Sequence, residues 1–132
     1  MKYLLDTHII LWELIGDKHL SNEVRQIIEN PKNEIFYSTA SAWEIEIKHL
    51  SKDNFKLSAD QFVFLCDNNG IANIQIKNSN ISKLKDIVKV KNAKHNDPFD
   101  RILLAQAISE NMILITHDSK FKAYSNPNIM LV

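Results

Sequence analysis

Short apolar segments alternate with helical patterns along the chain, and this alternation restricts the possible folds more than any other feature. The apolar segments have the length of strands and are bounded by turn residues, as expected for strands buried on both faces. They are KYLLD (2–6), EIFYS (34–38), IANIQI (71–76), MILIT (112–116) and NIMLV (128–132). Strands alternating with helices predict an α/β fold whose central, mostly parallel sheet of about five strands is covered by helices on both faces.

Several of the intervening helices have recognisable starting residues. Ser21 and Ser58 are predicted N-caps, because a serine hydroxyl can accept a hydrogen bond from a free amide of the first turn. Asp97 is predicted to cap a late helix that has Pro98 at its first position and Asp100 in its first turn. The interior of this late helix is apolar on nearly every side, so we expect it to be buried.

The segment TASAWEIEIKHL (39–50) fits two patterns. Polar and apolar residues alternate from Glu44 to Lys48, as in a strand, whereas the apolar residues between Ala40 and Leu50 repeat at helical spacing. We expect a helix. A helical wheel places Glu44 and Glu46 at similar distances from its apolar face, so periodicity does not distinguish between these two acids.

Length and composition indicate one ordinary globular domain over residues 1–132. The chain is 45% apolar and 24% charged, and it can enclose one substantial core. Its 16 basic and 16 acidic residues give a net charge of zero, so no global field attracts nucleic acid. Basic residues do gather locally, in KLKDIVKVKNAKH (83–95).

Cysteine usage and the amino terminus indicate the compartment. Cys66 is the only cysteine and lies in an apolar run, where we expect a small core residue rather than part of a disulfide framework. The amino terminus does not resemble a signal peptide, and no apolar run is long enough to span a membrane. We therefore expect a cytoplasmic protein without a membrane partner.

Acidic residues follow two of the predicted strands and open two of the predicted helices. Asp6 and Asp118 follow the first and fourth strands, Asp97 and Asp100 open the late helix, and Glu44 or Glu46 lies on the helix after strand two. Each acid taken alone has the explanation of a helix cap or a turn. Together they can converge on one cleft at the carboxyl edge of the sheet.

Clustered carboxylates predict metal chemistry. Two carboxylates about 4 Å apart repel each other by roughly 4 kcal/mol at an effective dielectric constant of 20, so a cluster requires bound protons or cations. Hard oxygen ligands suit Mg²⁺ or Mn²⁺, and such sites serve phosphoryl chemistry. The sequence contains no HExxH zinc motif, no GxSxG elbow and no glycine-rich phosphate loop.

Four segments resemble, in order and spacing, the PIN-domain family, and most closely the toxin ribonucleases of the VapC type. They are LLDTHIILW (4–12), SAWEIEIKH (41–49), DPFDRILLAQA (97–107) and LITHDSKF (114–121). The resemblance implies a three-layer α/β/α PIN-like fold and an Mg²⁺- or Mn²⁺-dependent endoribonuclease. Such an enzyme would hydrolyse RNA phosphodiesters through metal-bound water.

The resemblance also implies roles for individual residues. The catalytic and metal-binding set would be Asp6, Glu44, Asp100 and Asp118, and only the family pattern selects Glu44 over Glu46. Small hydroxyl residues next to the acids often occur in the family, and here they are Ser38, Ser41 and Thr116. We expect supporting roles for Thr116 and for Asp97, whose Pro98 context makes it the helix cap. Lys48 and Arg101 are candidates for binding substrate phosphates.

The expected partners are an RNA substrate, a small antitoxin protein and a second copy of the chain in a homodimer. Metal-assisted hydrolysis does not use the 2′-hydroxyl, so only the resemblance selects RNA over DNA. Three alternatives remain at this point: a PIN nuclease that processes RNA without an antitoxin, a phosphatase with Asp6 as nucleophile, and a noncatalytic binding module. His8 occupies the position where the phosphatase pattern DxD requires its second acid.

Overall fold

A computed structural model describes residues 1–132 as five strands, six α-helices and two 3₁₀ helices. The strands are β1 (Lys2–Leu5), β2 (Glu34–Ser38), β3 (Ala72–Ile74), β4 (Ile113–Thr116) and β5 (Ile129–Leu131). The α-helices are α1 (Thr7–Ile15), α2 (Asn22–Glu29), α3 (Thr39–Ser51), α4 (Ala59–Asn68), α5 (Asn78–Ser82) and α6 (Pro98–Ser109). The 3₁₀ helices are η1 (Lys83–Asp86) and η2 (Ser119–Ala123).

All five strands form one parallel sheet in the order β3-β2-β1-β4-β5. The chain winds outward from β1 through β2 to β3, then crosses back so that β4 pairs with the other side of β1. The change of direction between β1 and β4 is a topological switch point, where open α/β sheets usually have their binding site. The predicted α/β class and five-stranded sheet are confirmed.

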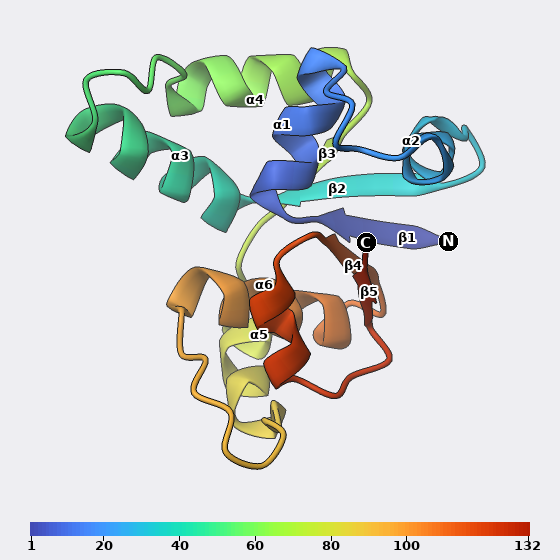
Figure 1. Cartoon of the computed structure of the whole chain (residues 1–132), viewed down its shortest axis with the longest axis vertical. Coiled ribbons are helices and arrows are strands. Elements are labelled where there is room, and N and C mark those ends of the chain that lie inside the picture. The colour runs from blue at the N-terminus through green and yellow to red at the C-terminus, as the bar shows by residue number, and fades with distance from the viewer.

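The sheet has a hydrophobic core on each face, because neighbouring residues of a strand point to opposite sides. Leu5 and Ile115 belong to the core beneath α1, α2 and α4, whereas Leu4 and Leu114 belong to the core beneath α6. Figure 1 shows α1 to α4 on one side of the strands and α5 and α6 on the other. The structure is therefore the three-layer α/β/α arrangement that was expected.

The predicted helix caps are present. Ser21 and Ser58 cap α2 and α4, and Asp97 caps α6 with Pro98 in its first turn. The ambiguous segment 39–50 is helical, as α3. No helix in the structure combines the length and the apolar character needed to cross a membrane.

The lysine-rich segment before α6 is fixed to the end of η2. Lys89 forms an isolated antiparallel bridge with Tyr124, and Val90 donates a 2.8 Å backbone hydrogen bond to Ala123. The Tyr124 hydroxyl donates to the backbone carbonyl of His95 at 2.9 Å. These contacts hold the segment next to η2 and bring His95 to the start of α6.

Candidate active site

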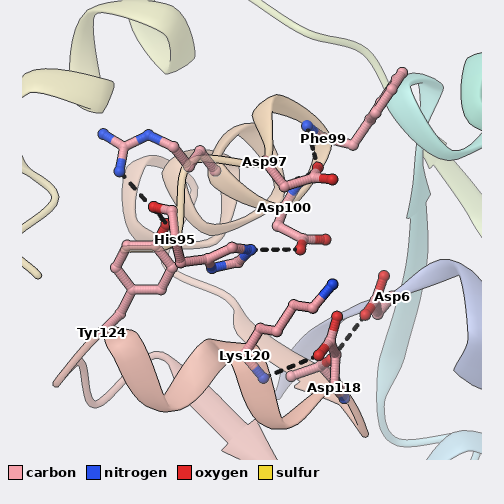
Figure 2. Close-up of polar contacts among 10 residues, drawn as sticks. Asp6, His95, Asp97, Phe99, Asp100, Asp118, Lys120 and Tyr124 are labelled. Atoms are coloured by element: carbon pink, nitrogen blue, oxygen red, sulfur yellow. Dashed lines mark hydrogen bonds and ion pairs between the residues drawn. The ribbon is translucent and has the colours of Figure 1, made fainter. Parts of the chain in front are cut away.

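The carboxyl ends of β1 and β4 meet the first turn of α6 at the switch point of the sheet. Asp6 directly follows β1, Asp118 lies two residues after β4, and Asp100 lies in the first turn of α6. Figure 2 shows these three carboxyl groups directed toward a common space. The convergence predicted for these three acids is present in the structure.

Asp6 is almost completely buried, with 7% of its surface exposed. One carboxyl oxygen, Oδ1, accepts from the Thr7 amide at 2.8 Å and so caps α1, while Oδ2 accepts from Thr116 Oγ1 at 2.7 Å. Burial raises the pKa of Asp6 above its ordinary value, and the hydrogen bonds from Thr116 and Thr7 oppose that rise. The cap and the site residue are therefore the same carboxylate.

The structure separates the two glutamates of α3. Glu44 Oε1 accepts from the hydroxyl of Thr7, the residue next to Asp6, at 2.8 Å. Glu46 Oε1 instead accepts from the amide of Ala59 at 3.1 Å, at the start of α4. Of the two, Glu44 is the one connected to the carboxylate cluster, as the family pattern predicts.

Thr7 is a site residue that the sequence analysis missed. It is buried, and its Oγ1 lies 2.8 Å from Glu44 Oε1 and 2.9 Å from Ser41 Oγ. Because a hydroxyl has one proton, we assign Thr7 as donor to Glu44 and Ser41 as donor to Thr7. Its sequence signal was a β-branched hydroxyl residue immediately after the first acid.

Asp100 has a strongly perturbed carboxyl group. Desolvation raises its pKa to about 8, helped by the charges of Asp6, Asp97, Asp118 and Glu44. The predicted supporting residue Asp97 uses its Oδ1 to accept from the amides of Phe99 and Asp100, at 2.9 and 3.1 Å. Asp97 is thus the helix cap, and Asp100 is the acid that faces the cluster.

Asp118 is the N-cap of η2 and is hydrogen-bonded to Thr116. Its Oδ1 accepts from the Lys120 amide at 2.9 Å, and its own amide donates to Thr116 Oγ1 at 3.1 Å. Thr116 therefore connects Asp6 with Asp118 through its hydroxyl group. The Lys120 side chain, which the sequence analysis did not single out, extends from η2 toward the space between Asp100 and the other two acids (Figure 2).

His95 is the second residue that the sequence analysis missed. Its Nε2 lies 2.9 Å from Asp100 Oδ2, and its side chain is only 8% exposed. Its Nδ1 is buried and has no hydrogen-bond partner. The sequence offered little signal for this contact, because His95 lies in the irregular segment before α6.

A small cavity opens beside Asp6 and Asp118. It has a volume of about 210 Å³ and is lined in addition by His8, Trp12 and His117. The Trp12 ring packs in an edge-to-face arrangement with both histidines, and His117 Nδ1 also lies 2.6 Å from the carbonyl of Val132. The two histidines next to the acids thus line the cavity wall.

The two predicted phosphate-binding residues lie in different surroundings. Lys48 lies one helical turn beyond Glu44 on the same face of α3, and its ammonium group makes no hydrogen bond or ion pair with the protein. The guanidinium of Arg101 lies 5.9 Å from the centre of the Tyr124 ring, with one nitrogen 3.4 Å from the Tyr124 hydroxyl. Arg101 therefore contacts Tyr124 within the protein, whereas the ammonium group of Lys48 is available to bind a phosphate.

The chemistry of the site fits a hard divalent cation. The four acids supply only carboxylate oxygens, the ligands that Mg²⁺ and Mn²⁺ prefer. Burial and the charges of the neighbouring acids raise the pKa of Asp100 to about 8, so a cation bound among these acids would be favoured. No three His, Cys, Asp or Glu side chains already lie close enough together to ligate one ion. Glu44 and Asp118 are half-buried, which leaves their carboxyl groups room to adjust.

Comparison with known protein families decides the family. A model of the PIN domain matches residues 3–127. The chain belongs to the PIN-domain family. A search of curated proteins found no match.

Several solved structures share this fold at low sequence identity, among them chains of VapBC complexes and of a toxin–antitoxin complex. A chain of DNA-bound VapBC from Salmonella typhimurium is 12% identical, with a TM-score of 0.70, and the match covers 98% of this PIN domain and 97% of that chain. A chain of VapBC2 from Rickettsia felis, bound to a promoter DNA fragment, is 20% identical, with a TM-score of 0.67 and coverage of 100% and 98%. A toxin–antitoxin complex from Klebsiella pneumoniae gives 20% identity, a TM-score of 0.60 and coverage of 97% and 95%.

Proposed function

We propose that residues 1–132 form one PIN nuclease domain that acts as an Mg²⁺- or Mn²⁺-dependent endoribonuclease, the toxin of a toxin–antitoxin pair. The observation that carries this proposal is the convergence of Asp6, Asp100 and Asp118 at the switch point, with Glu44 joined to Asp6 through Thr7. A group of partly desolvated acids is costly to the fold when no metal ion is bound, as the raised pKa of Asp100 indicates. This cost favours a function for the cluster over a purely structural role.

Four carboxylates would hold the ion: Asp6, Glu44, Asp100 and Asp118. A divalent cation supplies Lewis-acid activation of water and neutralises charge on the phosphate that is attacked. Thr116 and Thr7 hold Asp6 in place by occupying both of its oxygens, and Thr7 also orients Glu44. No protein nucleophile is required for this reaction.

Lys48 and Lys120 are placed to contact the RNA backbone on either side of the acids. Lys48 extends from α3 on the side of Glu44, and Lys120 extends from η2 on the side of Asp118. Each can attract a phosphate as a point charge. Arg101 is assigned instead to holding Tyr124 and the segment before α6.

The antitoxin and the second copy of the chain would bind through apolar surface. Trp43, Ile47 and Leu50 are exposed on α3, and Phe64 is exposed on α4. Exposed apolar patches of this kind are typical of protein interfaces. The structural neighbours named VapBC support a partner of the antitoxin class, and their names are the reason to prefer a toxin over an RNA-processing nuclease.

Cleavage of a mixed panel of structured RNA and DNA tests the proposed chemistry. We expect the protein to cleave RNA in the presence of Mg²⁺ or Mn²⁺, and EDTA to abolish this cleavage. Asp6→Asn and Asp100→Asn should each reduce the cleavage rate by at least about 10²-fold. Circular dichroism should show that both variants keep the fold. Full activity in EDTA, or in both variants, would contradict the metal mechanism.

Expression in a bacterial host tests the toxin role. Growth arrest by the wild type, but not by Asp100→Asn, is expected if the chain is a toxin. Harmless overexpression of protein that is active in vitro would favour the RNA-processing nuclease.

A further inference from the structure

The hydrogen bond between His95 and Asp100 occupies one particular oxygen of the carboxylate. His95 Nε2 contacts Oδ2, and no hydrogen bond from a neighbouring side chain reaches Oδ1. Figure 2 shows the imidazole approaching Asp100 from the side of Tyr124, away from Asp6 and Asp118. The contact therefore leaves the second oxygen of Asp100 free on the side of the other acids.

The surroundings of His95 favour one tautomer. Nδ1 is buried and has no partner, so a proton there would be an unsatisfied buried N–H, which is rarer in proteins than an acceptor without a donor. A proton on Nε2 is instead satisfied by the oxygen of Asp100 at 2.9 Å. The neutral imidazole with Nε2–H donating to Oδ2 satisfies the only donor on the ring.

The ring of His95 is held from several sides. It packs against Phe121 and Tyr124, with ring centres 5.8 and 5.2 Å apart, and the Tyr124 hydroxyl donates to its backbone carbonyl at 2.9 Å. Arg101, one residue after Asp100, contacts the same tyrosine. Both partners of the hydrogen bond are thus anchored to Tyr124, which limits the rotation of the imidazole relative to α6.

We propose that His95 is a positioning residue, whose Nε2–H holds Oδ2 of Asp100 so that Oδ1 faces the other carboxylates of the site. The role rests on the proposed function, because it assigns His95 to the ligand set of the nuclease. Hydrogen-bonded partners of ligating carboxylates fix the direction of the free oxygen, and their loss typically weakens metal binding or activity by about 10–100-fold. His95 touches neither the ion nor the RNA in this role.

Two substitutions separate the hydrogen bond from simple packing. His95→Leu retains an apolar side chain against Phe121 but removes the donor, whereas the amide nitrogen of His95→Gln can take the place of Nε2. His19→Leu is the matched control, because His19 also contacts an aspartate, Asp17 at 2.6 Å, but is exposed, contacts none of the four acids and reaches the cavity wall only by stacking on Trp12.

We expect His95→Leu to weaken Mn²⁺ binding, measured by calorimetry, and to lower kcat for RNA, each by about 10–100-fold, with KM changed less than threefold. His95→Gln is expected to recover most of both losses, and His19→Leu to match the wild type. Wild-type Mn²⁺ affinity and kcat in His95→Leu, or equal losses in the Leu and Gln variants, would overturn the positioning role.

A spectroscopic readout tests the hydrogen bond without any metal or activity. Nitrogen-15 NMR of the metal-free wild type is expected to show His95 with a protonated Nε2 and a bare Nδ1. The opposite tautomer, or rapid exchange between the two, would overturn the assignment even if the variants fail to fold. Wild-type protein that cleaves no RNA would contradict the proposed function, whereas wild-type cleavage with an unaffected His95→Leu variant would overturn only the role of His95.

Discussion

Thr116 Oγ1 donates a 2.7 Å hydrogen bond to Oδ2 of Asp6 and accepts a 3.1 Å hydrogen bond from the amide of Asp118. One hydroxyl therefore joins the ends of β1 and β4, although Thr116 and Asp6 are 110 positions apart in the chain. Because it uses both its donor and an acceptor site, Thr116 fixes two of the four proposed ligands at once.

Thr116→Val is expected to lower RNA cleavage by about 10–100-fold, because it removes an outer hydrogen bond to a proposed ligand. The hydrogen bond from Thr116 lowers the pKa of Asp6, so its loss should raise that pKa and move the acidic limb of the pH–rate profile to higher pH. Thr116→Ser retains the hydroxyl and should restore both the rate and the profile. An unchanged acidic limb in Thr116→Val would contradict this role.

Glu44→Gln and Glu46→Gln form a matched pair on one helix. Glu44→Gln should reduce cleavage by at least about 10²-fold, since it removes a proposed ligand next to Thr7. Glu46→Gln should retain wild-type cleavage, because its side chain caps α4 through the Ala59 amide and glutamine can still accept that hydrogen bond. Steady-state cleavage assays on the two variants decide the assignment. Equal losses in both variants would contradict the assignment of Glu44 alone to the site.

Asp100 makes the stability of the metal-free protein depend on pH. Its pKa is about 8 in the fold against an ordinary value of 3.8, so between these values the folded state binds one proton more than the unfolded state. The free energy of unfolding should therefore fall as the pH rises from about 4 to 8. Asp100→Asn should make this slope shallower in thermal melts recorded across the range, and Asp6, whose pKa burial also raises, should account for part of the slope that remains.

At pH 8 without divalent ions, Asp100→Asn is expected to be more stable than the wild type by about 1 kcal/mol, or ~3–5 °C in Tm, since the partly solvated carboxyl retains only part of the repulsion. Excess Mn²⁺ should reverse the order, because it binds only the wild type tightly. A wild type that gains stability between pH 4 and 8 would refute the electrostatic account.

Lys48→Gln is expected to weaken RNA binding for all sequences alike and to reduce the salt slope of log Kd by about 1, as loss of a phosphate contact does. Lys32→Gln is the control, because Lys32 precedes β2 at the amino edge of the sheet, away from the acids. Binding is measured in the Asp100→Asn background, so that the RNA stays intact. An unchanged salt slope would leave solvation of α3 as the role of Lys48.

Local patterns in the sequence were enough to predict where the capped helices begin and which segments form strands. Asp97 and Pro98 define the start of α6 through contacts within four residues, so no tertiary information was needed to place them. Cys66 was likewise predicted correctly as a buried core residue. The order of the strands follows from the same alternation only together with the crossover rules of parallel sheets.

Contacts between distant segments were beyond the reach of periodicity. Glu44 and Glu46 are equivalent on a helical wheel, and only the position of Thr7 relative to α3 distinguishes them. His95 lies in a segment without regular structure, which is fixed by its bridge to Tyr124. The sequence also gave no sign that Arg101 would be engaged by that tyrosine rather than exposed to substrate.

The strand order β3-β2-β1-β4-β5 also sets when the site can exist during synthesis. Asp6 leaves the ribosome early, but its neighbours in the cluster are contributed by α6 and by the turn after β4, so the first two thirds of the chain contain only half of the acids. A nascent chain cannot complete the cluster until residue 118 has been made and β4 has docked beside β1. A nuclease whose activity depends on this cluster therefore stays inert toward its own messenger until β4 and the start of η2 have been made.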